Sequence, residues 1–413
     1  MSIASEITDL NTNLNAAKNA VTTKGGTVGD TGLAGLASEI ASIPSGGSSS
    51  VTPKDINFYD YDGTLVESWD LSELSSKTAL PDAPTHDGLT SDGWNWTLVQ
   101  LQTQNTPMNV GHHYTPTDGK THLFVSVDAD HLSPTLGLGV NGTVNIDWGD
   151  GTTGTLSGSD TNSGVTTSHT YDSAGDYEVK IEVPSGTSAN VRGNTITTHL
   201  WRNSNFSSVN ADTRTYNGQL KEVWFGNNTG CGTGSMDYPF QSCFNLEKVC
   251  FPLSTLTAPN TVIFNKCCSI KFVSIPTGMI KASLGEYNMF EAVSLPPTME
   301  WIQEYCFSYN YVIKNICIPD SVSFLGNYSF RNQDQLQTVL LPKNLGTISQ
   351  GTFKNCGSVR LFDLSKVTAV PTLGSNGLPT ASDGLVIKVP SSLLASFQSA
   401  SNWSSYSSYM IGV

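Results

Sequence analysis

The sequence predicts a mostly β, multi-domain protein whose C-terminal half is a repeat solenoid, and three observations support this. Charged residues make up only 14% of the chain while 38 of its 413 residues are glycine, a composition that favours strands and turns over helices. A chain of this length fits several domains in series. A unit of between 20 and 24 residues recurs in the second half, as in solenoid architectures.

The first 44 residues are expected to form a helical segment. Apolar residues recur at spacings of three and four over Ile3–Val21, so that they form one stripe along a helix. After a break at residues 24–26, a second short stripe spans Leu33–Ile43. Residues 1–44 therefore form either a self-contained helical hairpin or a segment that docks on a partner or oligomerises, because so short a coiled coil is marginal alone.

A linker and a small module follow the helical segment. Residues 45–52 are rich in serine and glycine, the composition of a flexible linker. Residues 53–135 contain short β-like runs, at 56–59 and 122–127, between turns rich in proline and glycine. We expect this range to be a small α+β or β module.

A β-sandwich is predicted over residues 136–200. The run Val144–Thr152 contains a Trp-Gly-Asp-Gly turn, and the alternation of Tyr177–Val183 is typical of a half-buried strand. Together these segments resemble the polycystic-kidney-disease (PKD) type of immunoglobulin-like domain, which has a WGDG turn and an HxYxxxGxYxVxLxV strand. The resemblance implies a PKD-like β-sandwich.

The repeat lies within residues 201–365 and is the clearest pattern in the sequence. Its unit is F-x-x-C/N/Q-x-x-L/I/V-x-x-V/I-x-hydrophobic-P. Full copies begin at Phe240, Phe264, Phe307 and Phe330, a final copy without the proline begins at Phe353, and a compressed copy includes Phe290. The five prolines that end the units are 24, 20, 23 and 23 residues apart.

Each unit is expected to form one coil of a solenoid. The V-x-I pair forms a short strand with both side chains inward, the proline ends that strand where no hydrogen-bond donor is needed, and the phenylalanine fills the opposite side of the coil. The pattern therefore predicts a buried column of phenylalanine rings. Residues 366–413, which include Trp403, are expected to cap the last coil.

The eight cysteines are expected to be unpaired thiols. They form no C-x-x-C pair, so zinc-ribbon and thioredoxin spacings are absent from the sequence. Three of them share one position of the repeat, which indicates small buried packing residues and not a disulfide framework. The eight are Cys231, Cys243, Cys250, Cys267, Cys268, Cys306, Cys317 and Cys356.

One segment suggests catalysis. Phe58–Val66 resembles the DxDGT motif of haloacid-dehalogenase-type phosphohydrolases, in which the resemblance implies a nucleophile at Asp60 and a general acid/base at Asp62. That fold needs a parallel sheet with alternating helices, whereas residues 67–200 are rich in glycine, threonine and proline. A turn that closes a β-hairpin explains the same residues without chemistry. We therefore expect no enzyme and no catalytic or cofactor-binding residues.

Two groups of residues suggest metal binding. Asp147 and Asp150 are carboxylates beside glycines, which suits Ca²⁺, but in such turns aspartates usually cap backbone N–H groups. The histidines His112, His113, His122 and His131 are close in sequence. Adjacent histidines on a strand face opposite sides and cannot chelate one ion together, so exposed polar histidines are the default expectation and no metal site is predicted.

Five tryptophans could bind sugars, because aromatic faces pack on the apolar faces of sugar rings. The alternative is that they are packing residues of the core or of domain contacts, which is the commoner role of tryptophan. The five are Trp69, Trp94, Trp96, Trp201 and Trp224.

Charge and hydropathy limit the partners. The formal net charge of −14 would repel phosphate backbones and anionic lipids, so neither nucleic acid nor membrane insertion is expected. Residues 1–25 lack the basic start and the apolar core of a secretory signal, and no apolar run is long enough to span a bilayer. We expect the chain to be made in a host cytoplasm and to be soluble.

The repeats look like BspA-like leucine-rich repeats over about residues 215–365, and the N-terminal pattern is similar to the starts of many phage tail-associated proteins. These resemblances imply a bacteriophage virion fibre or tail/baseplate adhesin. It would bind other virion proteins through residues 1–44, recognise a host surface glycan or protein through the repeats, and form a homo-oligomer in the virion. A head- or neck-attached fibre or decoration protein, a bacterial surface adhesin and a phosphohydrolase remain as alternatives.

Overall fold

The computed structural model describes residues 51–191, 198–199, 202–203, 218–231, 239–255 and 262–413. The chain divides into two units, Met1–Thr52 and Pro53–Val413, and the fold described below is that of the second. The predicted helical segment 1–44 lies outside the described residues. No helix in the described part of the chain is long and apolar enough to cross a membrane.

The first sheet has the strand order β2-β1-β4-β3. β1 (Ile56–Tyr59) and β2 (Leu65–Trp69) form an antiparallel hairpin, β4 (Met108–Pro116) runs parallel to β1, and β3 (Leu89–Trp94) runs antiparallel to β4. Two short helices lie in the connections, α3 (Leu71–Leu74) and α4 (Leu98–Gln104). A capping box between Thr97 and Gln100 starts α4.

The second sheet has the order β13-β9-β6-β8-β5-β12-β14, with β7 paired to β6. Its strands are β5 (Thr121–Val127), β6 (Thr135–Asp147), β7 (Thr153–Ser168), β8 (Gly175–Glu182), β9 (Ser188–Val191), β12 (Leu220–Trp224), β13 (Thr229–Cys231) and β14 (Lys248–Cys250). A separate pair consists of β10 (Thr198–His199) and β11 (Arg202–Asn203). β5 comes from the range expected for the small module, but it pairs with β8 and β12 and so belongs to this second sheet.

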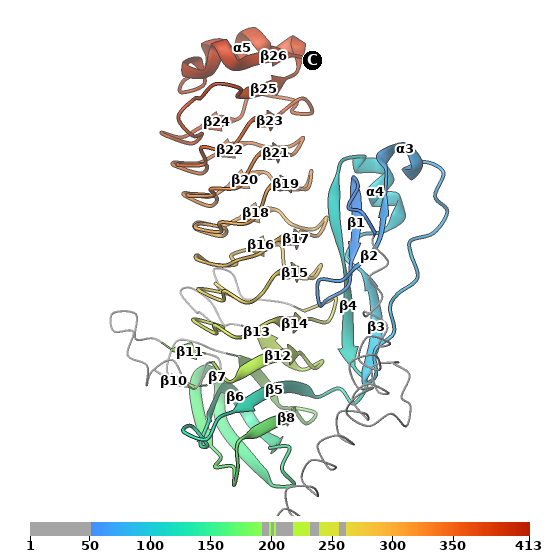
Figure 1. Cartoon of the computed structure of the whole chain (residues 1–413), viewed down its shortest axis with the longest axis vertical. Coiled ribbons are helices and arrows are strands. Elements are labelled where there is room, and N and C mark those ends of the chain that lie inside the picture. Colours follow the sequence, from blue (N-terminus) through green and yellow to red (C-terminus); the bar gives the residue numbers. More distant parts are fainter. Residues whose placement is uncertain (1–50, 192–197, 200–201, 204–217, 232–238, 256–261) are drawn as a thin grey trace, which may run out of the picture. The chain divides into compact units, whose positions relative to one another are not determined.

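The repeats form a β-solenoid in which parallel strands stack from coil to coil (Figure 1). One side holds β15 (Phe272–Ser274), β17 (Ala292–Ser294), β19 (Asn315–Cys317), β21 (Thr338–Leu340), β23 (Leu361–Asp363), β25 (Val386–Val389) and β26 (Met410–Gly412). The other side holds β16 (Lys281–Ala282), β18 (Trp301–Ile302), β20 (Phe324–Leu325), β22 (Thr347–Ile348) and β24 (Thr372–Leu373). The predicted mostly β fold with a C-terminal repeat solenoid is confirmed.

The phenylalanine column is confirmed, with one interruption. All five predicted rings are at most 1% exposed. Phe240 and Phe264 stack with ring centroids 5.5 Å apart, and Phe330 lies 5.0 Å from both Phe307 and Phe353. The intervening coil has Gly285 at this position, and an added Cβ there would lie 2.4 Å from the Phe264 carbonyl oxygen.

The coil that contains Gly285 is the compressed copy of the repeat. Phe290 does not take the column position of its coil, because Phe264 donates its backbone N–H to Leu284, the residue directly before Gly285. The same hydrogen bond precedes the column position in regular coils, where Phe307 donates to Ser329 directly before Phe330. Phe290 instead occupies the position of the inward Leu or Ile, 6.2 Å from Phe264.

The third residue after the column position forms a ladder of buried hydrogen bonds. Cys267 lies with its sulfur 2.7 Å from the Phe240 carbonyl oxygen, and Cys356 lies 3.0 Å from that of Phe330. Asn288 and Gln333 donate to the equivalent carbonyl groups of Phe264 and Phe307. Because a buried carbonyl needs a donor, this position accepts Cys, Asn or Gln but not an apolar residue. In the described part of the chain none of the eight cysteines is in a disulfide.

Both ends of the solenoid are covered. At its start, β12 pairs in parallel with β14, so the second sheet continues directly into the coils. At its end lie η2 (Ser391–Leu393), α5 (Leu394–Ser399) and η3 (Ser404–Tyr409) (Figure 1). Trp403 is buried there and donates its indole N–H to the Pro371 carbonyl group at 2.8 Å. Terminal coils of a solenoid need such covers because their apolar faces have no further neighbour.

The first sheet packs against the side of the first coils through β4 and the residues after β3 (Figure 1). Asn95, which is 1% exposed, donates to the Ser294 hydroxyl group at 2.8 Å and to the Ile275 carbonyl group at 3.1 Å. Trp96 donates to the Leu295 carbonyl group at 2.8 Å. The first sheet thus buries the outer face of these coils, and buried side-chain hydrogen bonds join the two.

Removing one ring of the column should destabilise the fold strongly. We expect Phe330→Ala to lower the free energy of unfolding by about 3–5 kcal/mol, because the ring is fully buried between two others. Phe324→Ala is the matched control, since Phe324 is half-buried on the outside of β20. Urea unfolding measures both variants. An equal loss of unfolding free energy in the two would contradict the assignment of Phe330 to a buried column.

Acid should destabilise the fold through His113. This side chain contacts the Phe251 carbonyl group at 2.9 Å and the Ser274 hydroxyl group at 2.7 Å, and burial lowers its pKa to about 4. A histidine of an unfolded chain has a pKa of about 6.5. The unfolded chain therefore gains a proton first as the pH falls, so the contribution of His113 is complete above about pH 6.5 and is lost toward pH 4, by about 3 kcal/mol.

The His113→Gln variant tests this directly. Glutamine keeps a donor for Phe251 and an acceptor for Ser274 but cannot take up a proton. Its free energy of unfolding should fall less than that of the wild type between about pH 7 and about pH 5. The same pH dependence in both proteins would show that His113 is not the titrating group.

Candidate binding surface

The turn between β1 and β2 contains the two aspartates of the phosphohydrolase-like motif. Asp60 donates its backbone N–H to the Thr64 carbonyl group at 2.9 Å, and the Asp62 carboxylate accepts from the Thr64 amide at 2.9 Å. The Asp60 carboxylate is 3% exposed and lies 2.7 Å from the His86 imidazole, and burial raises its pKa. The expectation that this motif closes a β-hairpin is confirmed.

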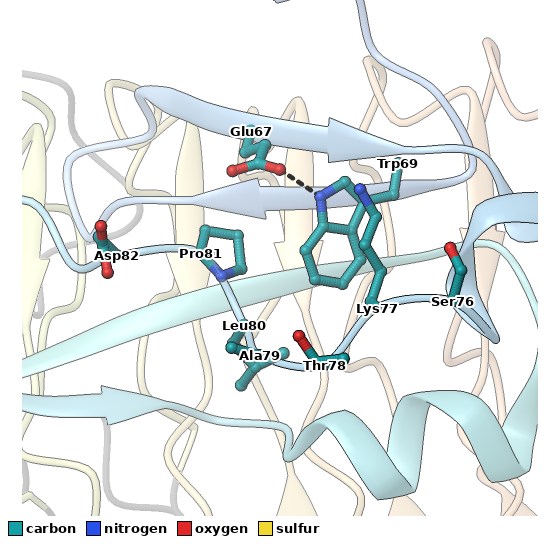
Figure 2. Close-up of a pocket in the computed structure, with 9 residues that line it drawn as sticks. All are labelled: Glu67, Trp69, Ser76, Lys77, Thr78, Ala79, Leu80, Pro81 and Asp82. Atoms are coloured by element: carbon teal, nitrogen blue, oxygen red, sulfur yellow. Dashed lines mark hydrogen bonds between the residues drawn. The ribbon is translucent and has the colours of Figure 1, made fainter.

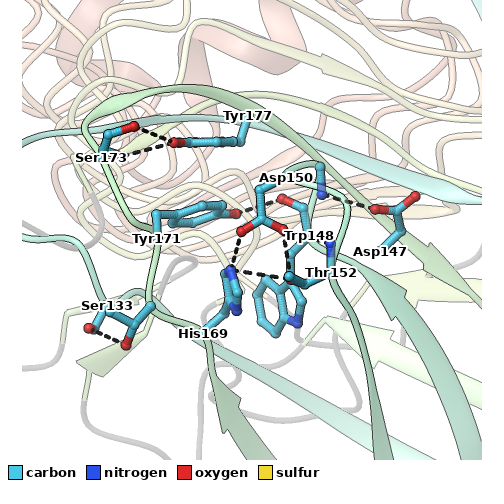
Figure 3. A network of polar contacts seen from close by, with 11 residues as sticks. Ser133, Asp147, Trp148, Asp150, Thr152, His169, Tyr171, Ser173 and Tyr177 are labelled. Atoms are coloured by element: carbon cyan, nitrogen blue, oxygen red, sulfur yellow. Dashed lines mark hydrogen bonds and ion pairs between the residues drawn. The ribbon is translucent and has the colours of Figure 1, made fainter.

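Asp147 and Asp150 cap the turn between β6 and β7, as predicted (Figure 3). Asp147 accepts from the Gly149 amide and Asp150 from the Thr152 amide, both at 3.0 Å. Asp150 also lies 2.6 Å from His169; despite partial burial, hydrogen bonds from Thr152 and His169 lower its pKa to about 2. Its carboxylate oxygens therefore already have partners.

The same network fastens this turn to the connection before β8 (Figure 3). His169 stacks on Trp148 with ring centroids 4.9 Å apart, and Tyr171 donates to the Trp148 carbonyl group at 2.8 Å. Tyr171 in turn stacks on Tyr177 at 3.9 Å. We interpret the network as structural. Among the described residues no group of three His, Cys, Asp or Glu side chains is placed to hold a metal ion.

The expectation of exposed histidines was wrong for three of the four. His112 and His113 are each 1% exposed and His122 is 4% exposed. Adjacent histidines do face opposite sides of β4: His113 contacts the solenoid, whereas His112 packs on Trp94 with ring centroids 4.7 Å apart. His122 is buried between the carboxylates of Asp118 and Glu178. Polar partners inside the fold make this burial possible.

Of the five tryptophans considered for sugar binding, the four that the structure describes are packing residues, the second of the two roles considered. Trp69 and Trp96 are each 3% exposed. Trp94 and Trp224 are half-buried and donate to the Pro81 carbonyl group and the Glu222 carboxylate. Trp201 lies outside the described residues.

A hollow of about 370 Å³ lies beside Trp69 in the first sheet (Figure 2). Residues 76–82 form one wall, and Glu67 accepts a hydrogen bond from the Trp69 indole. The Lys77 ammonium group lies 4.6 Å from the Trp69 ring centroid. Because the indole is almost fully buried and meets a cation, little ring surface remains there for a ligand.

The solenoid instead displays a cluster of aromatic side chains that sequence reasoning did not find. We call it the tyrosine surface; it consists of Tyr287, Tyr305, Tyr309, Tyr311, Tyr328 and Arg331. Tyr287 is 38% exposed and Tyr311 is 36% exposed, whereas the other four side chains are half-buried. The residues come from three successive coils.

The rings stack along the solenoid axis and enclose one cation. Tyr287 stacks on Tyr309 with centroids 4.3 Å apart and planes 10° apart, and Tyr305 stacks on Tyr328 at 5.6 Å and 13°. The Arg331 guanidinium carbon lies 4.8 to 5.7 Å from the ring centroids of Tyr305, Tyr309 and Tyr328. It donates to the Tyr309 hydroxyl group at 3.0 Å. These contacts hold the cluster in one arrangement.

Four of the tyrosines adopt a left-handed backbone conformation. Tyr287, Tyr305, Tyr309 and Tyr328 have φ between 56° and 58°. Other coils place Gly351 at the position of Tyr305 and Tyr328, two residues before the column ring. They place Asn332 and Asn355 at the position of Tyr309, two residues after it. A bulky side chain in this conformation costs about 1 kcal/mol, which glycine avoids and asparagine reduces.

A signal for the tyrosine surface was present in the sequence. Tyr305 and Tyr309 flank Phe307 at a distance of two residues, and Tyr328 precedes Phe330 by two. Comparison of these flanking positions with the two later copies shows Gly351 two residues before the column and Asn332 and Asn355 two residues after it.

A second aromatic pair, Trp301 and Phe324, lies on β18 and β20. Trp301 of β18 is 40% exposed, and its ring centroid lies 5.6 Å from that of Phe324 and 4.0 Å from the Lys281 ammonium group. Thr347 and Thr372 take the same outward position in later coils. This pair is smaller than the tyrosine surface and contains no buried cation.

A family model described as the BspA type leucine rich repeat region matches residues 194–290 and 281–375, with six copies. This match confirms the predicted resemblance for the repeat part of the chain. Such repeats on a solenoid are typical of non-enzymatic binding proteins. No curated protein matches the chain. The resemblance of residues 136–200 to a PKD-like domain stays a prediction.

Three solved structures are similar to part of the chain. A leucine rich repeat protein of T. pallidum is 19% identical over 41% of this chain and 71% of its own, with a TM-score of 0.29. A leucine rich cell surface protein of Faecalibacterium prausnitzii A2-165 is 17% identical over 42% and 55%, with a TM-score of 0.25. A leucine-rich repeat protein from Bacteroides ovatus ATCC 8483 is 16% identical over 47% and 66%, with a TM-score of 0.26.

Proposed function

We propose that this protein is a non-enzymatic adhesin whose leucine-rich repeat solenoid binds a macromolecule on a bacterial surface. The main support is the tyrosine surface. It presents large aromatic side chains beside Arg331, and later coils have Gly351 at the position of Tyr305 and Tyr328, and Asn332 and Asn355 at that of Tyr309. Tyrosine and arginine are the residues that contribute most to binding in protein interfaces.

The construction of the solenoid supports recognition over catalysis. Its apolar residues form one continuous core, and covers at both ends leave the outer side chains free for partners. A rigid surface of this kind loses little conformational freedom when it binds, which favours affinity. The aspartates and histidines considered for chemistry are instead part of hydrogen-bonded turns and sheet contacts.

The finer proposal is a bacteriophage virion fibre or tail/baseplate adhesin that recognises its host through the repeats. It is supported by the N-terminal sequence pattern, in which residues 1–44 would hold the protein to other virion proteins and form the homo-oligomer. Residues 45–52 would let the two ends orient independently. A head- or neck-attached fibre and a bacterial surface adhesin use the same repeats, and export from the producing cell would distinguish the latter.

Labelled full-length protein should bind intact bacterial cells. We expect saturable binding to a subset of a broad panel of species, with unlabelled protein as competitor, because a specific surface recognises few partners. Flow cytometry measures it, and the labelled protein denatured beforehand is the control. Failure to bind any cell above that control would reject the adhesin proposal.

Deletion of residues 1–44 should separate assembly from recognition. In a phage that encodes the protein, we expect the truncated form to be absent from purified particles yet still to bind host cells, because attachment and recognition lie at opposite ends of the chain. Immunoblots of particles, with the full-length protein as control, measure incorporation. Incorporation of the truncated protein at the wild-type level would overturn this polarity.

A further inference from the structure

We propose that the tyrosine surface is a contact site for a protein partner whose matching face has an apolar centre and a basic rim. This inference rests on the proposed function and names the class of ligand and the residues that bind it. It depends on three features of the cluster: its backbone conformation, the way its rings are stacked, and the charges around it.

The backbone conformation separates the tyrosines from the needs of the fold. Glycine or asparagine fits a left-handed position better than tyrosine does, and Gly351, Asn332 and Asn355 show that the coil folds with those residues. The buried column of phenylalanines two residues away supplies the core. The fold therefore does not require tyrosine at these positions. Residues with strained backbone conformations are frequent at binding sites.

The stacking determines what the surface can offer a ligand. Tyr287 meets Tyr309 and has the Lys266 ammonium group 5.6 Å from its ring centroid, while Tyr309 and Tyr328 each meet a second ring and Arg331. The faces of these three rings are thus in contact with other rings or cations, and ring edges and hydroxyl groups remain; Tyr311 makes only an edge contact with Tyr309. A sugar ring packs on an open aromatic face. Ring edges with hydroxyl groups and a held guanidinium group suit the mixed apolar and polar surface of a protein.

Three carboxylates lie near the cluster, against two cations, Arg331 and Lys266. Glu286 lies 3.8 Å from the Arg331 guanidinium group. Burial and then the charge of Glu304 raise the pKa of Tyr305, and burial and then Asp334 raise that of Tyr311, so both carboxylates are close to the rings. The whole chain has a net charge of −14. A partner with lysines or arginines around its contact centre would be attracted, and a partner with acidic residues there would be repelled.

The test uses substitutions that the solenoid itself contains. Tyr309→Asn copies Asn332 and Asn355, and Tyr328→Gly copies Gly351, so the double variant should fold with an unchanged melting temperature or a slightly higher one. Trp301→Thr is the matched control, because it removes an exposed aromatic side chain from the same coil region and copies Thr347 and Thr372. Tyr311→Ser, at an exposed position with ordinary backbone, is the second variant if the double variant melts early.

Full-length proteins are titrated onto cells that the wild type binds, either untreated, treated with protease or oxidised with periodate. We expect the double variant to lose at least about tenfold in affinity and the Trp301→Thr control to keep wild-type affinity. Protease treatment should abolish binding, periodate should not, and wild-type binding should weaken as salt is raised.

Each contrary result has its own meaning. Wild-type affinity in the double variant and in Tyr311→Ser would remove the tyrosine surface as the site while the adhesin proposal stands. Binding that survives protease but not periodate would replace the protein partner with a glycan. Absence of wild-type binding to any cell would reject the proposed function, and this inference with it.

Discussion

The regular coils of the solenoid place two demands on one residue: its ring must be buried at the column position, and its carbonyl group must receive a hydrogen bond from the following coil. Phe307, Phe330 and Phe353 meet the first demand by stacking at 5.0 Å. Cys356 and Gln333 meet the second. The stacked rings and the hydrogen bonds to their carbonyl groups involve the same residues. Together they fix the register of neighbouring coils, because a shift of one coil along the next would break both kinds of contact.

The irregular coil at Gly285 shows how these demands can be met differently. There the ring is absent, an added Cβ would collide with the Phe264 carbonyl oxygen, and Asn288 still donates to that carbonyl. Phe290 fills the core from the neighbouring position. Close approach of the backbone replaces the side chain, and the Gly285 carbonyl group accepts a hydrogen bond from Asn288 of its own coil instead of from Asn310 of the next.

The buried ring and the surface tyrosines occupy alternate positions of the same turn. Phe307 points into the core, while Tyr305 and Tyr309, two residues to either side, lie at the surface. The positions of these tyrosines tolerate Gly or Asn in other coils and so are free to vary without loss of the core. The ends of the solenoid are covered and the first sheet packs along the early coils, so exposed aromatic side chains of the described coils lie at these turns and at Trp301.

The sequence alone determined the features that local spacing encodes. The period of the repeat predicts the inward strand pairs, the prolines that end the strands, the phenylalanine column and cysteines that form no disulfides. The turn chemistry of Asp and Gly predicts the two aspartate-capped turns. Only the tertiary structure decided the rest. Burial of His113 depends on the first sheet meeting Ser274, 161 residues away, and the tyrosine surface depends on which outer residues of successive coils come together. The spacing of apolar residues shows which side chains face the core. Contacts between distant segments and between coils depend on how the strands and coils align in three dimensions, and a local sequence pattern does not encode that alignment.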